Sequence, residues 1–283
     1  MRYVETDQLL QDFMRPKLPH IWCPGCAHGI ITKAVLKAVR DLGLERQETV
    51  FVSGIGCASR SNVIMDFGTM HTTHGRALAF ATGIKAARPD LNVIVVTGDG
   101  DAAAIGGNHL IHAARRNIDI TLIVFQNGIY GMTGGQYGPT TRRGDITSTS
   151  PTGHLERPFD LASLVTGAGA TFVGRSTAYH FDLTVHLVQK AIQNPGFSLL
   201  EVVSSCPTYA GRLNGREQGF DSLKWMERHA EFGSTATDED HFPIGILHQG
   251  TAPEWTAVYH TLQVQAQEAA LAEARTASTA LPT

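Results

Sequence analysis

The sequence has no excess of charge of either sign. Its 283 residues include 23 Lys and Arg against 26 Asp and Glu, which gives a formal net charge of −3 at pH 7. Proteins that bind nucleic acid or an anionic membrane surface usually carry a basic stripe, because they must neutralise phosphate groups. The composition therefore favours neither a nucleic acid nor a membrane as partner.

Long apolar segments are also missing. No run approaches the roughly 20 apolar residues that a helix needs to cross a bilayer. The first ten residues, MRYVETDQLL, carry mixed charge and lack the apolar stretch of a secretory signal. We therefore expect a cytoplasmic protein. Apolar residues still make up 42% of the chain, enough to fill a sizeable core.

Cysteine is scarce, with four in the whole chain. Disulfides are rare in the cytoplasm, which leaves metal binding, catalysis or inert burial for these thiols. Cys23 and Cys26 form a C-x₂-C pair, while Cys57 and Cys206 each follow an expected strand. All four lie in turns rich in Gly or Pro, whereas an inert buried cysteine usually lies on the apolar face of an element. This placement favours a tetrathiolate metal site.

The spacing of the thiols bears on which metal they hold. Zinc and a [4Fe–4S] cluster both accept four thiolates. A structural zinc site more often uses two closely spaced pairs, whereas here the third and fourth cysteines come singly from distant strand ends. The distribution favours a cluster. A thioredoxin-like C-x-x-C is less consistent, because the pair does not follow the first strand of a βαβ unit.

Apolar periodicity predicts alternating strands and helices. The strands are apolar throughout, which indicates a sheet that is covered on both faces. The expected strands are 49–53, 92–97, 120–126 and 197–203, and the expected helices are about 27–42, 75–87, 103–116, 159–166 and 181–193. This pattern is typical of an α/β fold with a mostly parallel open sheet and helices on both faces.

Two stretches depart from this alternation. Residues 128–158 are rich in Gly, Thr, Arg and Pro and are too long for an ordinary connection, so we expect a functional or partner-covered loop. After about residue 215 the alternation fades, and a helix is expected from Trp255 that frays into the last four residues. We expect one domain over 1–215 and an extension, 216–283, that packs on the domain or on a partner subunit.

A phosphate-type turn follows the strand that ends at Thr97. Gly98–Asp101 reads Gly-Asp-Gly-Asp and opens a helix, so its glycines and free N–H groups suit a diphosphate and Asp99 suits a divalent cation. Gly-Asp-Gly alone is equally common in plain turns. Asn127 and the carbonyl of Ile129, however, follow the next strand, so oxygen ligands for Mg²⁺ can converge with Asp99.

As a set, six motifs between about residues 20 and 215 resemble the β subunit of 2-oxoacid:ferredoxin oxidoreductases. They are WCPGCAHG at 22–29, GIGCAS at 54–59, HTTHGR at 71–76, TGDGD at 97–101, NGIYGMTGGQ at 127–136 and SCP at 205–207. The resemblance implies the thiamine-diphosphate-binding fold that grips the diphosphate.

The resemblance also implies specific ligands. Thiamine diphosphate would be contacted by Ile55, Gly56, Cys57, Ala58 and His74, with further diphosphate contacts from Gly100, Asp101, Asn127, Gly131 and Met132. Mg²⁺ would be bound by Asp99, Asn127 and the carbonyl of Ile129, and one [4Fe–4S] cluster by Cys23, Cys26, Cys57 and Cys206. Cys57 would then belong to both sites.

The implied reaction is the reversible, coenzyme A-dependent oxidative decarboxylation of 2-oxoglutarate to succinyl-CoA and CO₂, with reduction of ferredoxin. The 2-oxoglutarate branch is indicated because some broad-specificity relatives have a lysine where this chain has Gly134. Pyruvate or another 2-oxoacid stays open as the substrate. A non-oxidative two-subunit thiamine decarboxylase also stays open, although four loop cysteines argue against it.

The chain contains no second α/β unit that could grip the cofactor's pyrimidine ring. Thiamine chemistry needs a carboxylate at that ring. We therefore expect no catalytic residue in this chain and an activating glutamate on an α subunit. The resemblance further implies a dimer of αβ heterodimers.

Several polar residues allow two interpretations. His74 could cap a helix rather than contact a cofactor, and His28 could orient a cluster or simply begin a helix. Arg142 and Arg143 could meet a substrate carboxylate or coenzyme A, or remain solvated.

Overall fold

An eight-stranded sheet forms the centre of the molecule in the computed structural model, which describes all residues except 1, 16–19, 234–240 and 280–283. The strand order is β2-β1-β3-β4-β8-β7-β10-β9. The strands are β1 (Thr49–Ser53), β2 (Gly68–His71), β3 (Asn92–Gly98), β4 (Thr121–Gln126), β7 (Phe172–Thr177), β8 (Ser198–Val203), β9 (Ala230–Phe232) and β10 (Phe242–Gln249). Two short strands, β5 (Ile129–Tyr130) and β6 (Gln136–Tyr137), pair with each other outside it.

The sheet is mostly parallel. All neighbours from β2 to β7 run in the same direction, and only the pairing of β10 with β7 is antiparallel. The parallel strands are joined by helical crossovers, as the alternation in the sequence predicts. The expected fold class, a mostly parallel α/β sheet, is therefore confirmed.

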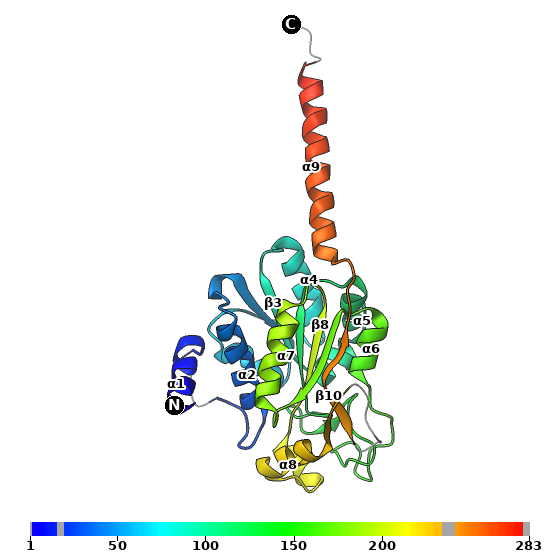
Figure 1. Ribbon diagram of the computed structural model, residues 1–283. Coiled ribbons are helices and arrows are strands. Elements are labelled where there is room, and N and C mark those ends of the chain that lie inside the picture. Colours follow the sequence, from blue (N-terminus) through cyan, green and yellow to red (C-terminus); the bar gives the residue numbers. More distant parts are fainter. Residues whose placement is uncertain (1, 16–19, 234–240, 280–283) are drawn as a thin grey trace.

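Helices cover both faces of the sheet (Figure 1). The helices are α1 (Arg2–Phe13), α2 (His28–Asp41), α3 (Ser61–Ile64), α4 (Ala77–Ala87), α5 (Gly107–Arg116), α6 (Leu161–Ala168), α7 (Phe181–Gln193), α8 (Gly219–His229) and α9 (Trp255–Thr279). Successive residues of β3 point to opposite faces. Ile94 and Val96 pack in the core layer beneath α2 and α7, while Val93 and Val95 pack in the layer beneath α4, α5 and α6.

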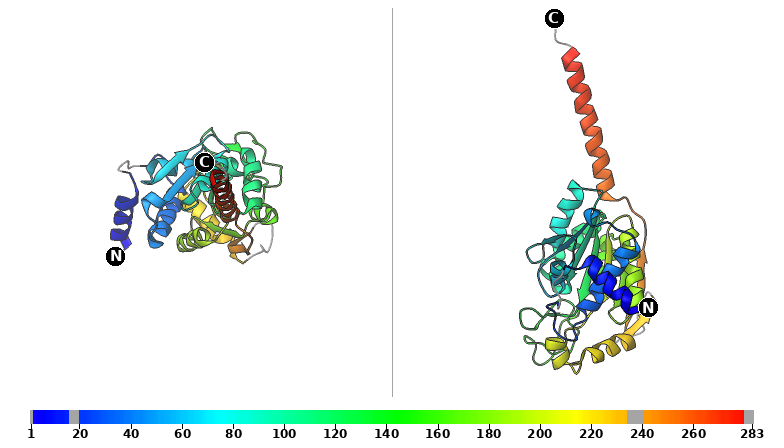
Figure 2. Two further views of the ribbon diagram at one scale, coloured as in Figure 1. Left: turned by 90° about the horizontal axis from the view of Figure 1, so that it is seen from above. Right: turned by 90° about the vertical axis from the view of Figure 1, so that its left-hand side faces the viewer.

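The two ends of the sheet differ in what they carry. Because β1, β3, β4, β8 and β7 are parallel, their carboxyl ends meet at one edge, where ligands bind in open α/β sheets. β10 runs the other way, so α9 leaves from the opposite end and extends away from the sheet (Figures 1 and 2).

Within the described part of the chain, no helix has the length and apolar character of a membrane span.

The C-terminal part of the chain joins this sheet. β9 and β10 lie beyond residue 215 and form its edge next to β7. The expected division at residue 215 stays a prediction. The expected helix from Trp255 is α9, and the expected fraying over 280–283 lies outside the described residues.

Candidate functional site

A cavity of about 80 Å³ lies at the carboxyl ends of β1, β3 and β4. It brings together every residue that the sequence assigns to the cofactor and to Mg²⁺. These are Ile55, Gly56, Cys57, Ala58, His74, Asp99, Gly100, Asp101, Asn127, Ile129, Gly131 and Met132. The loops after three parallel strands therefore form one site.

Asp99 is a buried carboxylate with neutral partners. Its side chain is 2% exposed and accepts hydrogen bonds from the Thr140 hydroxyl and, at 3.4 Å, from the backbone N–H of Asn127. Burial raises the pKa of the Asp99 carboxyl to about 6, because the buried carboxylate loses its hydration and the hydrogen bonds from Thr140 and Asn127 offset this loss only in part. A divalent cation would supply that stabilisation, so the environment of Asp99 fits a Mg²⁺ ligand.

Asn127 and Ile129 lie in the turn after β4, beside Asp99. The Asn127 side-chain oxygen accepts a hydrogen bond from the backbone N–H of Ile129 at 3.2 Å, which fixes its direction. Asp99, Asn127 and Ile129 all line the cavity. Carboxylate, amide and carbonyl oxygens are the donor set that a hard cation prefers, so these residues fit the ion that the sequence predicts.

Asp101 holds the cavity wall together. Its Oδ1 accepts hydrogen bonds from the backbone N–H groups of Gly75 at 2.7 Å and Ile55 at 3.4 Å, and lies 2.5 Å from His74 Nδ1. A carboxylate would repel a diphosphate, so what Asp101 can offer such a ligand is its backbone N–H at the start of a helical turn. That turn, Gly100–Ile105, is π-helical, a geometry that is frequent at functional sites.

Glycines allow the backbone segments of the wall to approach closely. A Cβ on Gly54 would overlap the Asp101 carboxylate, and one on Gly100 would overlap the Tyr130 ring. Gly75 has a φ of +72°, and a Cβ there would lie 2.8 Å from the backbone nitrogen of Gly106. Only glycine fits these positions without a shift of the wall.

We expect Gly75→Ala to lower the free energy of unfolding by about 1–3 kcal/mol, because it adds both a strained φ and a steric overlap. Gly83→Ala is the matched control, since Gly83 lies in α4 with open space where a Cβ would be. It should raise stability by about 0.5–1 kcal/mol through helix propensity. Urea unfolding measures both, and equal effects would contradict the close approach at Gly75.

The four cysteines converge beside this cavity, and all are free thiols. A Cβ on Gly131 would lie 3.4 Å from Cys206 Sγ and 3.6 Å from Cys57 Sγ. Burial, together with the smaller effect of the neighbouring Cys206, Cys57 and Cys23, raises the pKa of the Cys26 thiol to about 12. The C-x₂-C turn, the β1 loop and the β8 loop therefore bring their thiols into mutual electrostatic range.

Four thiols in one place could bind a single metal ion or an iron–sulfur cluster. Among the described residues, no three His, Cys, Asp or Glu side chains are grouped as ligands of one metal ion. Zinc would draw its thiolates to within about 3.8 Å of one another, because each Zn–S bond is about 2.3 Å. A [4Fe–4S] cluster binds four thiolates around a larger body.

Five further residues line the cavity that the sequence did not single out as ligands: His28, Gly98, Phe125, Tyr130 and Thr133. Tyr130 lies between Ile129 and Gly131, which were both predicted to contact ligands, so its place in the sequence could have indicated that it lines the cavity. Thr140 is 41 residues from Asp99, and nothing in the sequence pairs them. His28 lies beside the cavity rather than only at the start of a helix.

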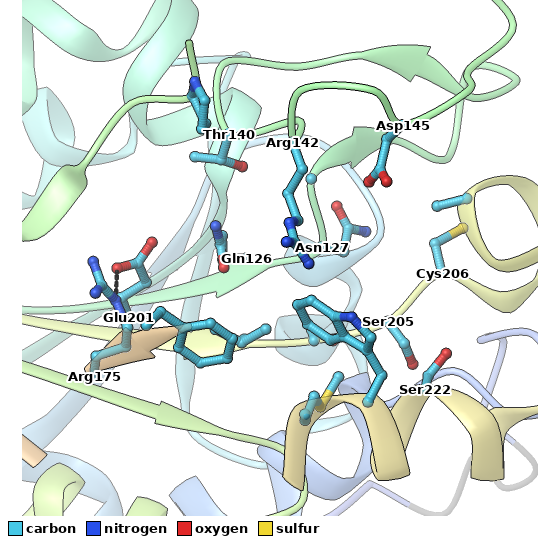
Figure 3. A pocket seen from close by; sticks show the side chains of 18 of the residues that line it. Gln126, Asn127, Thr140, Arg142, Asp145, Arg175, Glu201, Ser205, Cys206 and Ser222 are labelled. Atoms are coloured by element: carbon cyan, nitrogen blue, oxygen red, sulfur yellow. Dashed lines mark hydrogen bonds and ion pairs between the residues drawn. The ribbon is translucent and has the colours of Figure 1, made fainter. Parts of the chain in front are cut away.

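A second, larger cavity of about 390 Å³ shares one lining residue, Asn127, with the first, and Figure 3 shows side chains that line it. Arg175 pairs there with Glu201 at 2.7 Å and with Asp160 at 3.0 Å. The guanidinium group of Arg142 lies 4.8 Å from the centre of the Trp225 ring. Arg142 is thus part of a cavity wall, whereas Arg143 is exposed.

Comparisons with known proteins agree on one group. The family model described as thiamine pyrophosphate enzyme, C-terminal TPP binding domain, matches residues 54–202. The 2-oxoglutarate synthase subunit KorB of Archaeoglobus fulgidus is 57% identical over 199 residues, which are 70% of this chain and 74% of that protein. The subunit of the same name from Methanothermobacter marburgensis is 49% identical over 227 residues, 80% of each chain.

A solved structure is similar over nearly the whole chain. It is the 2-oxoglutarate:ferredoxin oxidoreductase from Magnetococcus marinus with 2-oxoglutarate, coenzyme A and succinyl-CoA bound. The TM-score is 0.82 at 31% identity, and the match covers 96% of both chains. All residues that line the smaller cavity, except His28, lie within residues 54–202, which the family model matches.

Proposed function

Because this chain belongs to the family of 2-oxoglutarate synthase KorB subunits and carries a thiamine-diphosphate-binding domain, we propose that it is the β subunit of a 2-oxoglutarate:ferredoxin oxidoreductase. The enzyme would convert 2-oxoglutarate, coenzyme A and oxidised ferredoxin to succinyl-CoA, CO₂ and reduced ferredoxin, and would also run in reverse. It would act in the cytoplasm.

One observation carries this proposal: the loop after β1 belongs to both parts of the site. Cys57 lines the cavity with Asp99 and Asn127, and its thiol lies near that of Cys206. A site that couples decarboxylation to electron transfer needs its organic cofactor and its electron acceptor close together. A non-oxidative thiamine decarboxylase has no need for four thiols at this place, so that alternative is disfavoured.

We assign Mg²⁺ to Asp99, Asn127 and the Ile129 carbonyl, and one [4Fe–4S] cluster to Cys23, Cys26, Cys57 and Cys206. When bound, thiamine diphosphate supplies a nucleophilic thiazolium ring for attack on the 2-oxo carbon, and the cluster accepts single electrons. The cofactor would be enclosed by Ile55, Gly56, Ala58, His74, Gly131 and Met132, and the N–H groups of Gly100 and Asp101 would hold its diphosphate.

The chain's own residues would bind and orient the cofactor, and they would not remove the proton that activates it. We propose that the glutamate that activates the cofactor comes from an α subunit, and that two αβ heterodimers form the enzyme. Asp101 keeps the loops of Ile55 and His74 in place. Asp99 keeps its direction through Thr140.

We expect Thr140→Val to weaken thiamine diphosphate binding about tenfold, because residues that orient a metal ligand typically contribute 10–100-fold to affinity. Valine keeps the shape but removes the donor to Asp99. Thr140→Ser keeps the donor and should bind nearly as well as the unaltered protein. Calorimetric titration with Mg²⁺ and thiamine diphosphate measures this, and equal affinity for Val and Ser would show that the hydroxyl is unimportant.

The preference for 2-oxoglutarate has one structural support. Gly134, where some broad-specificity relatives have lysine, has a φ of +115°. A side chain is strained in that conformation, so the loop here is built for glycine. Pyruvate and other 2-oxoacids are the alternative substrates.

The test is reduction of viologen or ferredoxin by the anaerobically copurified αβ enzyme. 2-Oxoglutarate, pyruvate and a branched 2-oxoacid are compared in parallel, each with and without coenzyme A. We expect the highest kcat/KM for 2-oxoglutarate, and activity only with coenzyme A. Aldehyde formation without electron transfer would instead identify a non-oxidative decarboxylase.

A further inference from the structure

Two side chains flank the C-x₂-C turn, and each hydrogen-bonds to a different cysteine loop. Trp22 precedes Cys23, and its indole N–H donates to the backbone carbonyl of Cys57 at 2.7 Å. His28 lies two residues after Cys26, and its Nδ1 is 2.8 Å from the hydroxyl of Ser204. Ser204 lies two residues before Cys206. Two ties, the hydrogen bonds from Trp22 to Cys57 and between His28 and Ser204, therefore connect the C-x₂-C turn to the loops that carry the two distant thiols.

Both anchoring side chains are fixed by their surroundings. Trp22 is 8% exposed and His28 is 1% exposed. The His28 ring packs edge-on against Trp22 and against Phe125 of β4, with centroids 6.1 and 5.3 Å away. Hydrogen bonds made by such immobilised groups lose little entropy, so they hold the loops at a defined spacing.

The far end of the hydrogen bond made by His28 is also anchored. The backbone N–H of Ser204 donates to the carbonyl of Gln126 at 2.7 Å, which fixes Ser204 to the end of β4. The backbone N–H of His28 donates to Cys26 and so interacts directly with one of the thiols. Cys26, His28, Ser204 and Gln126 thus form a continuous connection from a thiol to the sheet edge that carries Asn127.

We propose that Trp22 and His28 are positioning residues that set the spacing of the four thiols before a cluster is bound, and thereby determine how tightly it is held and at what potential it is reduced. The inference rests on the proposed function, because it takes the four thiols to be cluster ligands. The four thiols come from three separate loops, and loops that were free to move would separate, because a flexible chain gains conformational entropy when it is not held. The Trp22 and His28 hydrogen bonds oppose this separation.

The test uses Trp22→Phe and Ser204→Ala in the anaerobic αβ complex. Ser204→Ala removes one hydroxyl, Trp22→Phe removes the indole N–H together with part of the ring, and both leave the cysteines in place. We expect iron to be lost to a chelator about tenfold faster in each variant, the size typical of interactions around metal ligands. We also expect a shifted midpoint potential in an EPR-monitored titration, which a general loss of stability would not produce. Thiamine diphosphate binding should be retained, which shows that the variants are folded.

Ser205→Ala is the matched control, because Ser205 is the neighbouring buried serine and its hydroxyl has no hydrogen-bond partner among the described residues. It should release iron at the unaltered rate. Unaltered rates and potentials in both Trp22→Phe and Ser204→Ala would overturn the positioning role. Absence of iron and sulfide from the unaltered complex would instead overturn the proposed function itself.

Discussion

Replacement of Asp99 by Asn is expected to abolish retention of thiamine diphosphate, with affinity lower by at least about 100-fold. Orienting residues around a metal ligand already contribute 10–100-fold, and Asp99 is proposed as a ligand itself. Asparagine has nearly the same shape, so the cavity should keep its form. The loss of affinity would then come from the missing negative charge, which attracts Mg²⁺.

The measurement is calorimetric titration with thiamine diphosphate at saturating Mg²⁺. Asp90→Asn is the control, because Asp90 is an exposed carboxylate in a pair with Arg88, away from the cavity. It should bind the cofactor normally. Retained affinity in Asp99→Asn would show that the cation is held elsewhere or is not needed.

Replacement of Cys206 by Ala is expected to reduce electron transfer to viologen or ferredoxin by at least about 100-fold while leaving the cofactor bound. The thiol of Cys206 lies near that of Cys57 but does not line the smaller cavity. A cluster that loses one of four thiolates is poorly held. The iron content should fall together with the activity.

This result would be the converse of the one for Asp99. Asp99→Asn should keep iron and lose thiamine diphosphate, whereas Cys206→Ala should lose iron and keep thiamine diphosphate. Iron analysis and cofactor titration on the same αβ preparations measure both. Normal iron and normal reduction of viologen in Cys206→Ala would contradict the assignment of the four thiols.

Much of the fold could be predicted because apolar residues dominate the buried strands. β1 begins and ends where expected, β3 and β8 differ by one residue at one end, and α7 has the expected bounds. Strands of this kind are covered on both faces, so their side chains show a simple apolar run.

The strands that were not predicted lack that simple pattern. β7 contains Arg175, Ser176 and Thr177, which look exposed in sequence but are buried. Arg175 is buried because Glu201 on the adjacent strand neutralises it at 2.7 Å, and this partner is 26 residues away. β2 is a short edge strand, and β10 pairs with residues about 70 positions earlier, so neither carries a strong local signal.

The residues of the candidate site also fall into a predictable group and an unpredictable group. Residues in turns directly after strands could be predicted, because parallel strands bring their carboxyl ends together. The groups that hold those residues in place could not be predicted. Thr140 reaches Asp99 and Ser204 reaches His28 only through folding, over 41 and 176 residues.

The double role of the Cys57 loop has a thermodynamic consequence. If the loop's position affects both the diphosphate and the thiols, the affinity for one cofactor must depend on the state of the other, and linkage requires this dependence to be equal in both directions. Suppose that the bound diphosphate stabilises the reduced cluster, relative to the oxidised cluster, by a certain free energy. Reduction of the cluster must then strengthen diphosphate binding by the same free energy. The affinity of the protein for thiamine diphosphate would then depend on whether the cluster is oxidised or reduced.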